Sequence, residues 1–593
     1  QARLAVAWYD EDQHQVLACV EKLIEQFPED ANLKLQKVSA LRMLARRSER
    51  LAYLKAICRE EKSDPLFLQQ YAQELSEDAR ENRAALRLLH RSFRARPLEA
   101  SNFYLLANLR WTSRMFEEAL ELYRIAACLK ETNEQYVQSY FIAARHLHQT
   151  QEAIRFLTRR FERFGRNSGF PARTLSWAYE QTGQSTQALA VLREGLVLRP
   201  LDGDLMLYAS DAFARYGDFE QAAALLAAAE GKAARTETLR GAATIASYRG
   251  ELRESLRLWR QVLDAEPLAS DANRGVAQLL AETEGQERAV EFLREATERF
   301  PHSWSLHQLL IEWLRDDVDE AEKILRHVIE IEPVNAWARR ELAYKLAQQR
   351  RFSEALQEAA LGSQLEPDNP HSFCVIGSIH AEAGDFLQAR EAFREAIRLS
   401  VDSEYAINEL IANSHTIDER QHSLEFIRQE LIRQVTFGDG LFAYRHAART
   451  TLSDEETLGL LRDALAARPD LWHAWSAVIH QLADMHQLDE ALQLANEATG
   501  RFPLVPRLWL DLAYIHQVNL NHAGQIDALL QARRINPTWN MATQQLAEAY
   551  QRIGEFAKAR ELLEQAIAYS PLEHTNYGYL AEVLWLMGEK EPA

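Results

Sequence analysis

Hydrophobic residues along this chain fall into two helical stripes that recur with a period of about 34 residues. In residues 540–573 the first stripe stands at positions 7, 8 and 11 of the segment, and the second at positions 20, 24 and 27. Spacings of three and four residues place side chains on one face of a helix. Each period therefore predicts two amphipathic helices. The residues concerned are Leu546, Ala547, Tyr550, Ala559, Leu563 and Ala566.

Proline and glycine punctuate the same period. Glycine recurs at position 15, between the two stripes, where it can adopt the positive φ of a tight turn. Proline recurs at position 32, where it cannot continue a helix. Alanine or glycine at positions 8 and 20 allows two helix backbones to approach closely. The prolines at the C-terminal end are evenly spaced by one period: Pro469, Pro503, Pro537 and Pro571.

This pattern resembles the tetratricopeptide repeat (TPR) family, whose signature places W, L, G and Y in the first helix, A and F in the second, and P at the end. The resemblance covers nearly the whole chain and implies about 17 units. The expected fold is all-α: an α-solenoid in which helix-turn-helix units stack as a right-handed superhelix, because one hairpin cannot bury its own apolar faces.

The period weakens in two places. The unit at 302–335 is two residues short, which should tighten its inter-helix turn. In 404–470 the charged Arg445 stands at close-approach position 8, and two glycines precede a helix after Phe437. We expect an N-terminal array over 1–436 and a C-terminal array over 437–593, either continuous or kinked within 404–470. Both ends fall out of phase with the repeat, which favours a piece of a longer protein.

Charge is uneven along the chain and argues against some partners. Residues 1–200 carry a net +5 and residues 201–593 a net −24, for a total of −19. An acidic surface repels phosphate backbones, so nucleic acid is not an expected partner. No run of about 18 apolar residues occurs, so no membrane association is expected. We expect a cytoplasmic protein, or a periplasmic one if a signal peptide was removed.

No recognised constellation for catalysis or cofactor binding appears. There is no nucleophile elbow, P-loop, dinucleotide fingerprint or H-E-x-x-H motif. The four cysteines are too far apart for C-x-x-C chemistry. His473 and His480 could share a helix face, but two histidines do not make a metal site without a third ligand. We therefore expect no enzyme activity, no metal and no cofactor.

Arginines supply the candidate contacts. TPR arrays line their inner face with the first helices, and position 5 of those helices reads Arg173, Leu207, Arg240 and Arg274 in consecutive units, then Arg340. Guanidinium groups pair with carboxylates in a bidentate manner. The row could bind an acidic peptide, or it could pair with Asp and Glu of the array itself. A second basic face on one helix comprises Arg155, Arg159 and Arg163, followed by Arg166.

The resemblance implies an interaction scaffold that binds a partner protein or peptide, acidic if these arginines are its contacts, along the concave groove. The alternative is a substrate-recruiting or regulatory arm of a larger multidomain enzyme, a protease or glycosyltransferase, whose catalytic part lies outside this chain. A third hypothesis is the periplasmic arm of a polysaccharide exporter. The sequence does not identify the partner or the oligomeric state.

Overall fold

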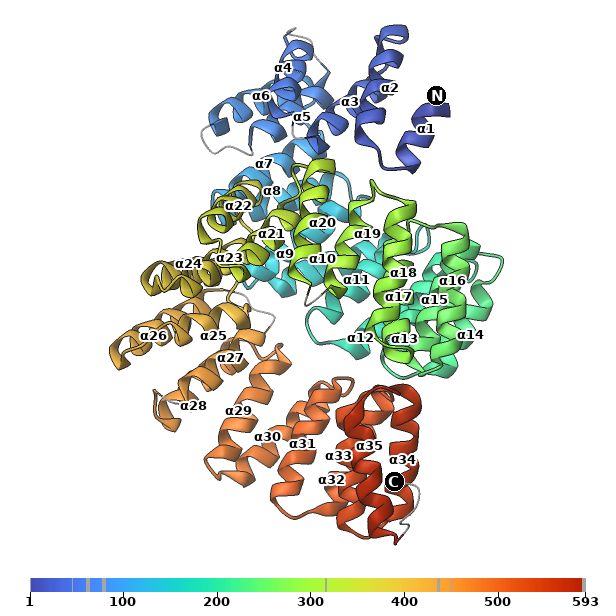
Figure 1. The fold of residues 1–593 in the computed structure, drawn as a ribbon, viewed down its shortest axis with the longest axis vertical. Coiled ribbons are helices and arrows are strands. Elements are labelled where there is room, and N and C mark those ends of the chain that lie inside the picture. The colour runs from blue at the N-terminus through green and yellow to red at the C-terminus, as the bar shows by residue number, and fades with distance from the viewer. Residues whose placement is uncertain are drawn as a thin grey trace. The chain divides into compact units, whose positions relative to one another are not determined.

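A computed structural model describes residues 2–44, 46–59, 64–76, 81–314, 317–434, 438–449 and 451–588. Within those ranges the chain forms 35 helices and no strand (Figure 1). They make 17 consecutive pairs and one last helix, as the sequence predicts. We call the first helix of a pair A and the second B.

The A helices carry odd numbers. They are α1 (Ala2–Tyr9), α3 (Ala31–Met43), α5 (Pro65–Leu75), α7 (Ala100–Thr112), α9 (Glu134–His146), α11 (Phe170–Glu180), α13 (Gly203–Arg215), α15 (Arg235–Tyr248), α17 (Ser270–Thr283), α19 (Trp304–Trp313), α21 (Ala336–Gln348), α23 (Pro370–Glu382), α25 (Glu404–Ala412), α27 (Asp439–Ala448), α29 (Trp472–Asp484), α31 (Pro506–Val518), α33 (Asn540–Arg552) and α35 (His574–Leu586).

The B helices carry even numbers. They are α2 (Gln13–Gln26), α4 (Arg47–Ile57), α6 (Asn82–Ala95), α8 (Phe116–Leu129), α10 (Thr150–Phe164), α12 (Ser185–Leu198), α14 (Phe219–Ala229), α16 (Leu252–Ala265), α18 (Gln286–Arg299), α20 (Val318–Ile331), α22 (Phe352–Leu365), α24 (Phe386–Leu399), α26 (Ile417–Arg433), α28 (Asp454–Ala467), α30 (Leu488–Arg501), α32 (His522–Ile535) and α34 (Phe556–Tyr569).

Small residues and turn glycines act as the period predicts. Ala547 and Ala559, at positions 8 and 20 of one unit, are both buried where α33 packs on α34. The turn residues Gly217 and Gly554 have φ of 80° and 82°. Leu520 stands at the equivalent turn position with φ of 56°, a conformation that is costly for a side chain with a Cβ atom.

Aromatic residues at position 4 link successive hairpins. The indole Nε1 of Trp475 donates to the Pro469 carbonyl at 3.0 Å, and that of Trp509 donates to the Pro503 carbonyl at 2.9 Å. Trp475 is buried in the core of this region. The ring thus fills the apolar seam while its polar edge satisfies the carbonyl of the proline that closes the preceding unit.

The weak segments keep the hairpin plan by local adjustments. In the short unit, α19 has 10 residues where α21 has 13. The predicted tight turn includes residues 315 and 316, which lie outside the described residues. Arg445 is tolerated at position 8 because its Nε donates to Gln481 Oε1 at 3.2 Å and its Nη2 pairs with Asp484.

Contacts divide the chain into two compact units: Gln1–Arg160 with Ala296–Leu399, and Phe161–Glu295 with Ser400–Ala593. The array boundary predicted at 436/437 stays a prediction, since residues 435–437 lie outside the described part of the chain. Just beyond it, the backbone N–H groups of Gly438 and Gly440 donate to Asp402 Oδ1 at 2.9 and 3.2 Å. This carboxylate fixes the start of α27 against the segment that leads into α25.

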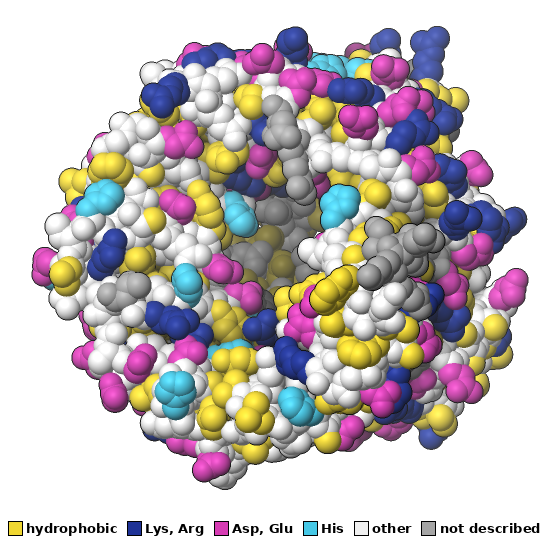
Figure 2. Space-filling view, turned by 60° about the horizontal axis from the view of Figure 1, so that its bottom comes forward, with side chains coloured by type: hydrophobic (Ala, Val, Ile, Leu, Met, Phe, Trp, Pro, Cys, Tyr) yellow, Lys and Arg dark blue, Asp and Glu magenta, His cyan; other side chains and the backbone are white. Residues whose placement is uncertain are grey.

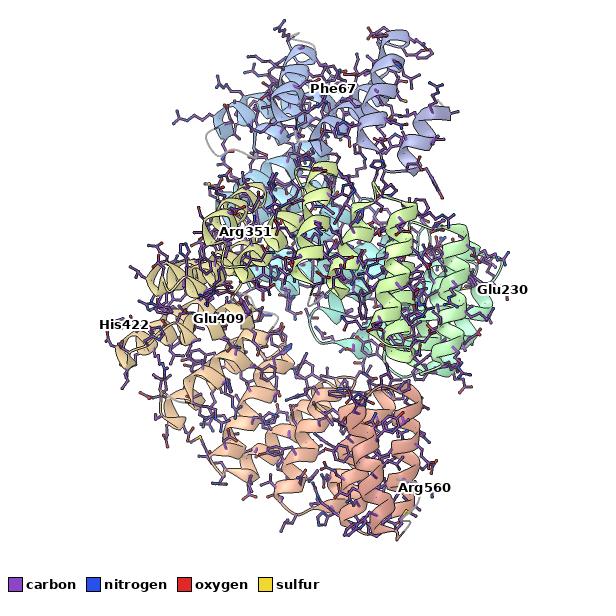
Figure 3. All side chains as sticks on the ribbon, in the orientation of Figure 1. Phe67, Glu230, Arg351, Glu409, His422 and Arg560 are labelled. Atoms are coloured by element: carbon purple, nitrogen blue, oxygen red, sulfur yellow. The ribbon has the colours of Figure 1, made fainter. Side chains whose placement is uncertain are left out.

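Each unit has an inner layer of A helices. Consecutive A helices contact each other in several places, for example α21 with α23 and α13 with α15. In a curved stack the more closely spaced layer lies on the concave side, so A-helix side chains line the inner surface. Ion pairs also hold neighbouring hairpins together: Arg351, labelled in Figure 3 and one residue before α22, pairs with Glu322 of α20 at 2.9 Å and with Glu354 of α22 at 2.6 Å.

Candidate functional site: arginines of the inner layer

Arg240 on α15 is engaged by three carboxylates of the array itself. Its Nε donates to Asp271 Oδ2 at 2.7 Å, its Nη1 to Glu237 Oε1 at 2.9 Å and its Nη2 to Glu266 Oε2 at 2.5 Å. These bonds, that to Glu266 first, raise the pKa of the guanidinium against the opposing effect of burial. The sequence left open whether this arginine binds an acidic peptide or pairs with carboxylates of the array. In the structure Arg240 pairs with carboxylates of the array.

Arg340 on α21 has the same kind of partner. It is largely buried, and its Nη1 donates to Glu366 Oε2 at 2.5 Å. Glu266 and Glu366 each lie 26 positions after the arginine they bind and immediately before a period-closing proline. The residue 26 positions after Arg274 of α17 is Phe300, which is not acidic. The Arg274 side chain is exposed. An acidic residue before the closing proline is thus the sequence signal for the ion pairs of Arg240 and Arg340.

Arg173 on α11 differs because the residue 26 positions later is Arg199, not an acid. Its guanidinium lies 5.4 Å from the ring centroid of Phe170 and 4.8 Å from that of Tyr208. Among the described residues it has no carboxylate partner. Cation–π contacts orient the guanidinium without neutralising its charge, so it remains able to bind an anion.

A hollow of about 340 Å³ opens beside Arg173. Lys232 adds a second positive charge to its wall, and Asp204 adds a negative one. Arg199 and Asp202 also line it but neutralise each other, with Nε donating to Oδ2 at 2.6 Å. Burial raises the pKa of Tyr208 to about 12, so its phenol stays neutral beside the guanidinium. The sequence pattern did not single out Phe170, Tyr208 or Lys232.

The basic helix α10 presents two kinds of arginine. Arg155, Arg159 and Arg163 are exposed, and Arg163 packs over the Phe164 ring at 4.9 Å. Arg160 is instead buried, where its Nε donates to the Glu131 carbonyl at 2.6 Å and its Nη2 pairs with Glu134. Only the exposed residues could meet a partner.

His480 and His473 take part in packing and hydrogen bonding within the array. His480 Nε2 lies 2.9 Å from Asp511 Oδ1, a buried carboxylate that also accepts from Arg507 at 3.2 Å. His473 stacks on Trp472 with ring centroids 3.6 Å apart. In the residues that the structure describes, no three His, Cys, Asp or Glu side chains are grouped to hold a metal ion.

Surface charge is mixed over the face that Figure 2 shows, with Lys and Arg interspersed among Asp and Glu. Within the described part of the chain, no helix combines the length and apolar character that crossing a bilayer requires.

Comparison with known proteins agrees with the repeat architecture. Two family models described as tetratricopeptide repeat match the chain, one over residues 173–236, 240–303, 480–538 and 545–591 and the other over residues 370–400. Together with the 17 helix pairs of the described residues, these matches show that the matched segments are tetratricopeptide repeats. Proteins of this class typically act as non-catalytic scaffolds that bind other proteins along extended concave surfaces.

A curated relative shares part of the sequence. TPR repeat-containing protein PA4667 of Pseudomonas aeruginosa is 32% identical over 134 residues, which is 22% of this chain and 22% of that protein. The alignment thus spans less than a quarter of the relative. A solved chain of the APC/C hetero-tetramer Cut9–Hcn1 aligns over 93% of this chain and 95% of its own length, at 13% identity and a TM-score of 0.27. That score is too low to support any functional comparison.

Proposed function

We propose that this protein is a non-enzymatic scaffold that binds a partner protein or peptide along the inner layer of A helices. The observation that carries the proposal is the Arg173 guanidinium, which is held between two rings beside a hollow and is not neutralised by a carboxylate of the described array. Such a group favours an acidic side chain of the partner. The net charge of −24 over residues 201–593 disfavours nucleic acid in that role.

The other arginines contribute less to the proposed binding surface. Arg274 is exposed on α17 and can add a contact in the same row. Arg240 and Arg340 would have to exchange carboxylates of the array for those of a partner. The residues Arg155, Arg159 and Arg163 form an exposed basic face on α10 that suits docking of an acidic surface. Arg173 is therefore the residue to substitute in the test.

The test compares what the immobilised full chain retains from a lysate of its source with what two charge-reversed variants retain. Arg173→Glu should lower retention of at least one protein tenfold or more, about 1.4 kcal/mol of binding free energy. Arg253→Glu makes the same charge change on an exposed B-helix position of α16 and should retain that protein as the native chain does.

Thermal melting separates binding from folding in this test. Arg173→Glu loses two cation–π contacts of about 0.5–1 kcal/mol each but breaks no ion pair that the structure describes, so the variant should remain folded at the working temperature. Equal retention by all three proteins, or no protein retained by the native chain, would contradict the proposal.

A further inference from the structure

Three turn glycines of one compact unit lie against helix ends that are distant in the sequence. They stand between the A and B helices of consecutive hairpins, in the turns α11–α12, α13–α14 and α15–α16. A Cβ atom added to any of them would collide with the C-terminal end of a B helix, that of α30, α32 or α34. Both groups belong to the unit formed by Phe161–Glu295 and Ser400–Ala593. The pairs are Gly183 with Phe502, Gly217 with Arg534 and Ile535, and Gly250 with Tyr569.

These contacts, which we call the glycine seam, follow the repeat. Each glycine is 318 or 319 residues away from the apolar side chain that it meets, so consecutive hairpins meet consecutive hairpins in one register. Other turn glycines behave differently, because a Cβ atom added to Gly285, Gly384 or Gly554 would meet nothing within 4 Å. The close approach is therefore specific to three turns and is not a general property of the turn glycines.

Burial on both sides of the glycine seam agrees with this contact. Thr182, in the α11–α12 turn, is 2% exposed, whereas Ile553, at the same place in the α33–α34 turn, is 44% exposed. Ile535, the last residue of α32, is 6% exposed, whereas Leu129, the last residue of α8, is 40% exposed. Residues at the seam are thus shielded from water where equivalent residues of other hairpins are not.

The paired residues meet through van der Waals contact. Each of the three glycines donates its N–H to a carbonyl of its own turn, at 2.9–3.0 Å, and in the described structure none of the paired residues exchanges a hydrogen bond across the seam. Dispersion between individual atom pairs is weak, and the contact at each glycine is small. The helices of one hairpin instead share a continuous buried core. Separation of the seam should therefore cost less free energy than unfolding of a hairpin.

We propose that the glycine seam is a releasable clasp between two stretches of the solenoid, Phe161–Glu295 and Ser400–Ala593. The clasp is closed in this structure, and its three turn positions must be glycine because a side chain there would force the stretches apart. When the clasp opens, the two stretches separate as intact rows of hairpins, and the spacing between their inner layers changes. The inference rests on backbone packing and does not depend on the proposed role of Arg173.

Hydrogen exchange of the free full chain, corrected for intrinsic sequence rates, tests the clasp. The turns at 216–218 and 553–555 can be compared directly, because Gly217 and Gly554 each donate their N–H to the carbonyl three residues earlier at 3.0 Å. A closed clasp should slow exchange at 216–218 about tenfold relative to 553–555. Because the clasp opens while the hairpins stay folded, the amides in the middle of α13 should exchange more slowly still.

Asparagine substitutions provide a matched pair of variants. Asparagine tolerates the left-handed conformation, so Gly217→Asn keeps its turn, but its side chain would collide with the Arg534 carbonyl. Exchange should then accelerate about tenfold at 249–251 as well, one hairpin away, because the clasp opens as a unit. Gly554→Asn makes the same change at φ of 82° in open space and should leave the rate at 249–251 unchanged. Circular dichroism should show the same helical content in all three proteins.

Three outcomes would contradict the clasp. Equal exchange at 216–218 and 553–555 in the native chain would mean that the seam does not form in solution. Exchange at 216–218 as slow as in the middle of α13 would mean that the seam opens only when the hairpins unfold. Acceleration by Gly217→Asn confined to its own turn would mean that the seam does not act as a unit. If that variant does not fold, Tyr569→Ala removes the ring against Gly250 and should accelerate exchange at 249–251, and an unchanged rate would overturn the proposal.

Discussion

Replacing Glu74 by alanine should lower the free energy of unfolding of its compact unit by about 3 kcal/mol or more. The carboxylate is 1% exposed and pairs with Arg50, which is 3% exposed. Without it, the buried Arg50 guanidinium loses this carboxylate partner, and less of its desolvation penalty is offset. Urea denaturation of the native chain and the variant, followed by circular dichroism, measures the loss.

A double variant provides the matched control for this pair. Arg50→Met combined with Glu74→Leu removes both charges and keeps apolar volume, so most of the lost stability should return. A Glu74→Ala variant that loses less than about 1 kcal/mol would show that the pair is not buried as described, since that is the range of surface ion pairs.

Acidification should destabilise the region around His473 by about 2 kcal/mol at pH 5 relative to pH 7. Burial lowers the pKa of this imidazole to about 4, against a smaller opposing effect of Asp402. The Asp439 carboxylate lies 3.4 Å from Nε2, but water screens it because it is largely exposed. Since the folded state favours neutral imidazole, its stabilising effect is complete above the unfolded pKa of about 6.5 and is lost as pH falls toward 4.

Thermal melting at the two pH values gives the readout. His473→Leu keeps an apolar side chain beside Phe442 and Trp472 and removes the titrating group. Its melting temperature should fall less between pH 7 and pH 5 than that of the native chain. Parallel decreases in the two proteins would mean that other groups control the acid response.

The fold could be predicted from the sequence because the information is local and repeated. Small residues at positions 8 and 20, such as Ala547 and Ala559, and position-4 aromatics such as Trp475 act in the same way in many hairpins. The shortening of α19 was less predictable, since two missing residues can come from a helix or from its turn. How the charged Arg445 is accommodated at position 8 was harder still to predict. Its partners lie on the next A helix, α29, at positions that carry no consensus residue.

The candidate sites depend on longer-range relations, which explains why the sequence indicated them only in part. The pairing of Arg240 with Glu266 follows the period and could have been found by inspecting the residue before each closing proline. The ring contacts of Arg173 need the geometry of α11 and α13.

Hydrogen exchange of the complex formed with the captured partner tests the central claim most directly. The partner is the protein that the native chain retains and the Arg173→Glu variant loses. If the inner layer holds it, amide exchange should slow in the A helices α11, α13 and α15 and remain unchanged in the B helices α12 and α14. Protection confined to those B helices, or no protection in any of the five, would contradict an account in which the concave layer is the binding surface.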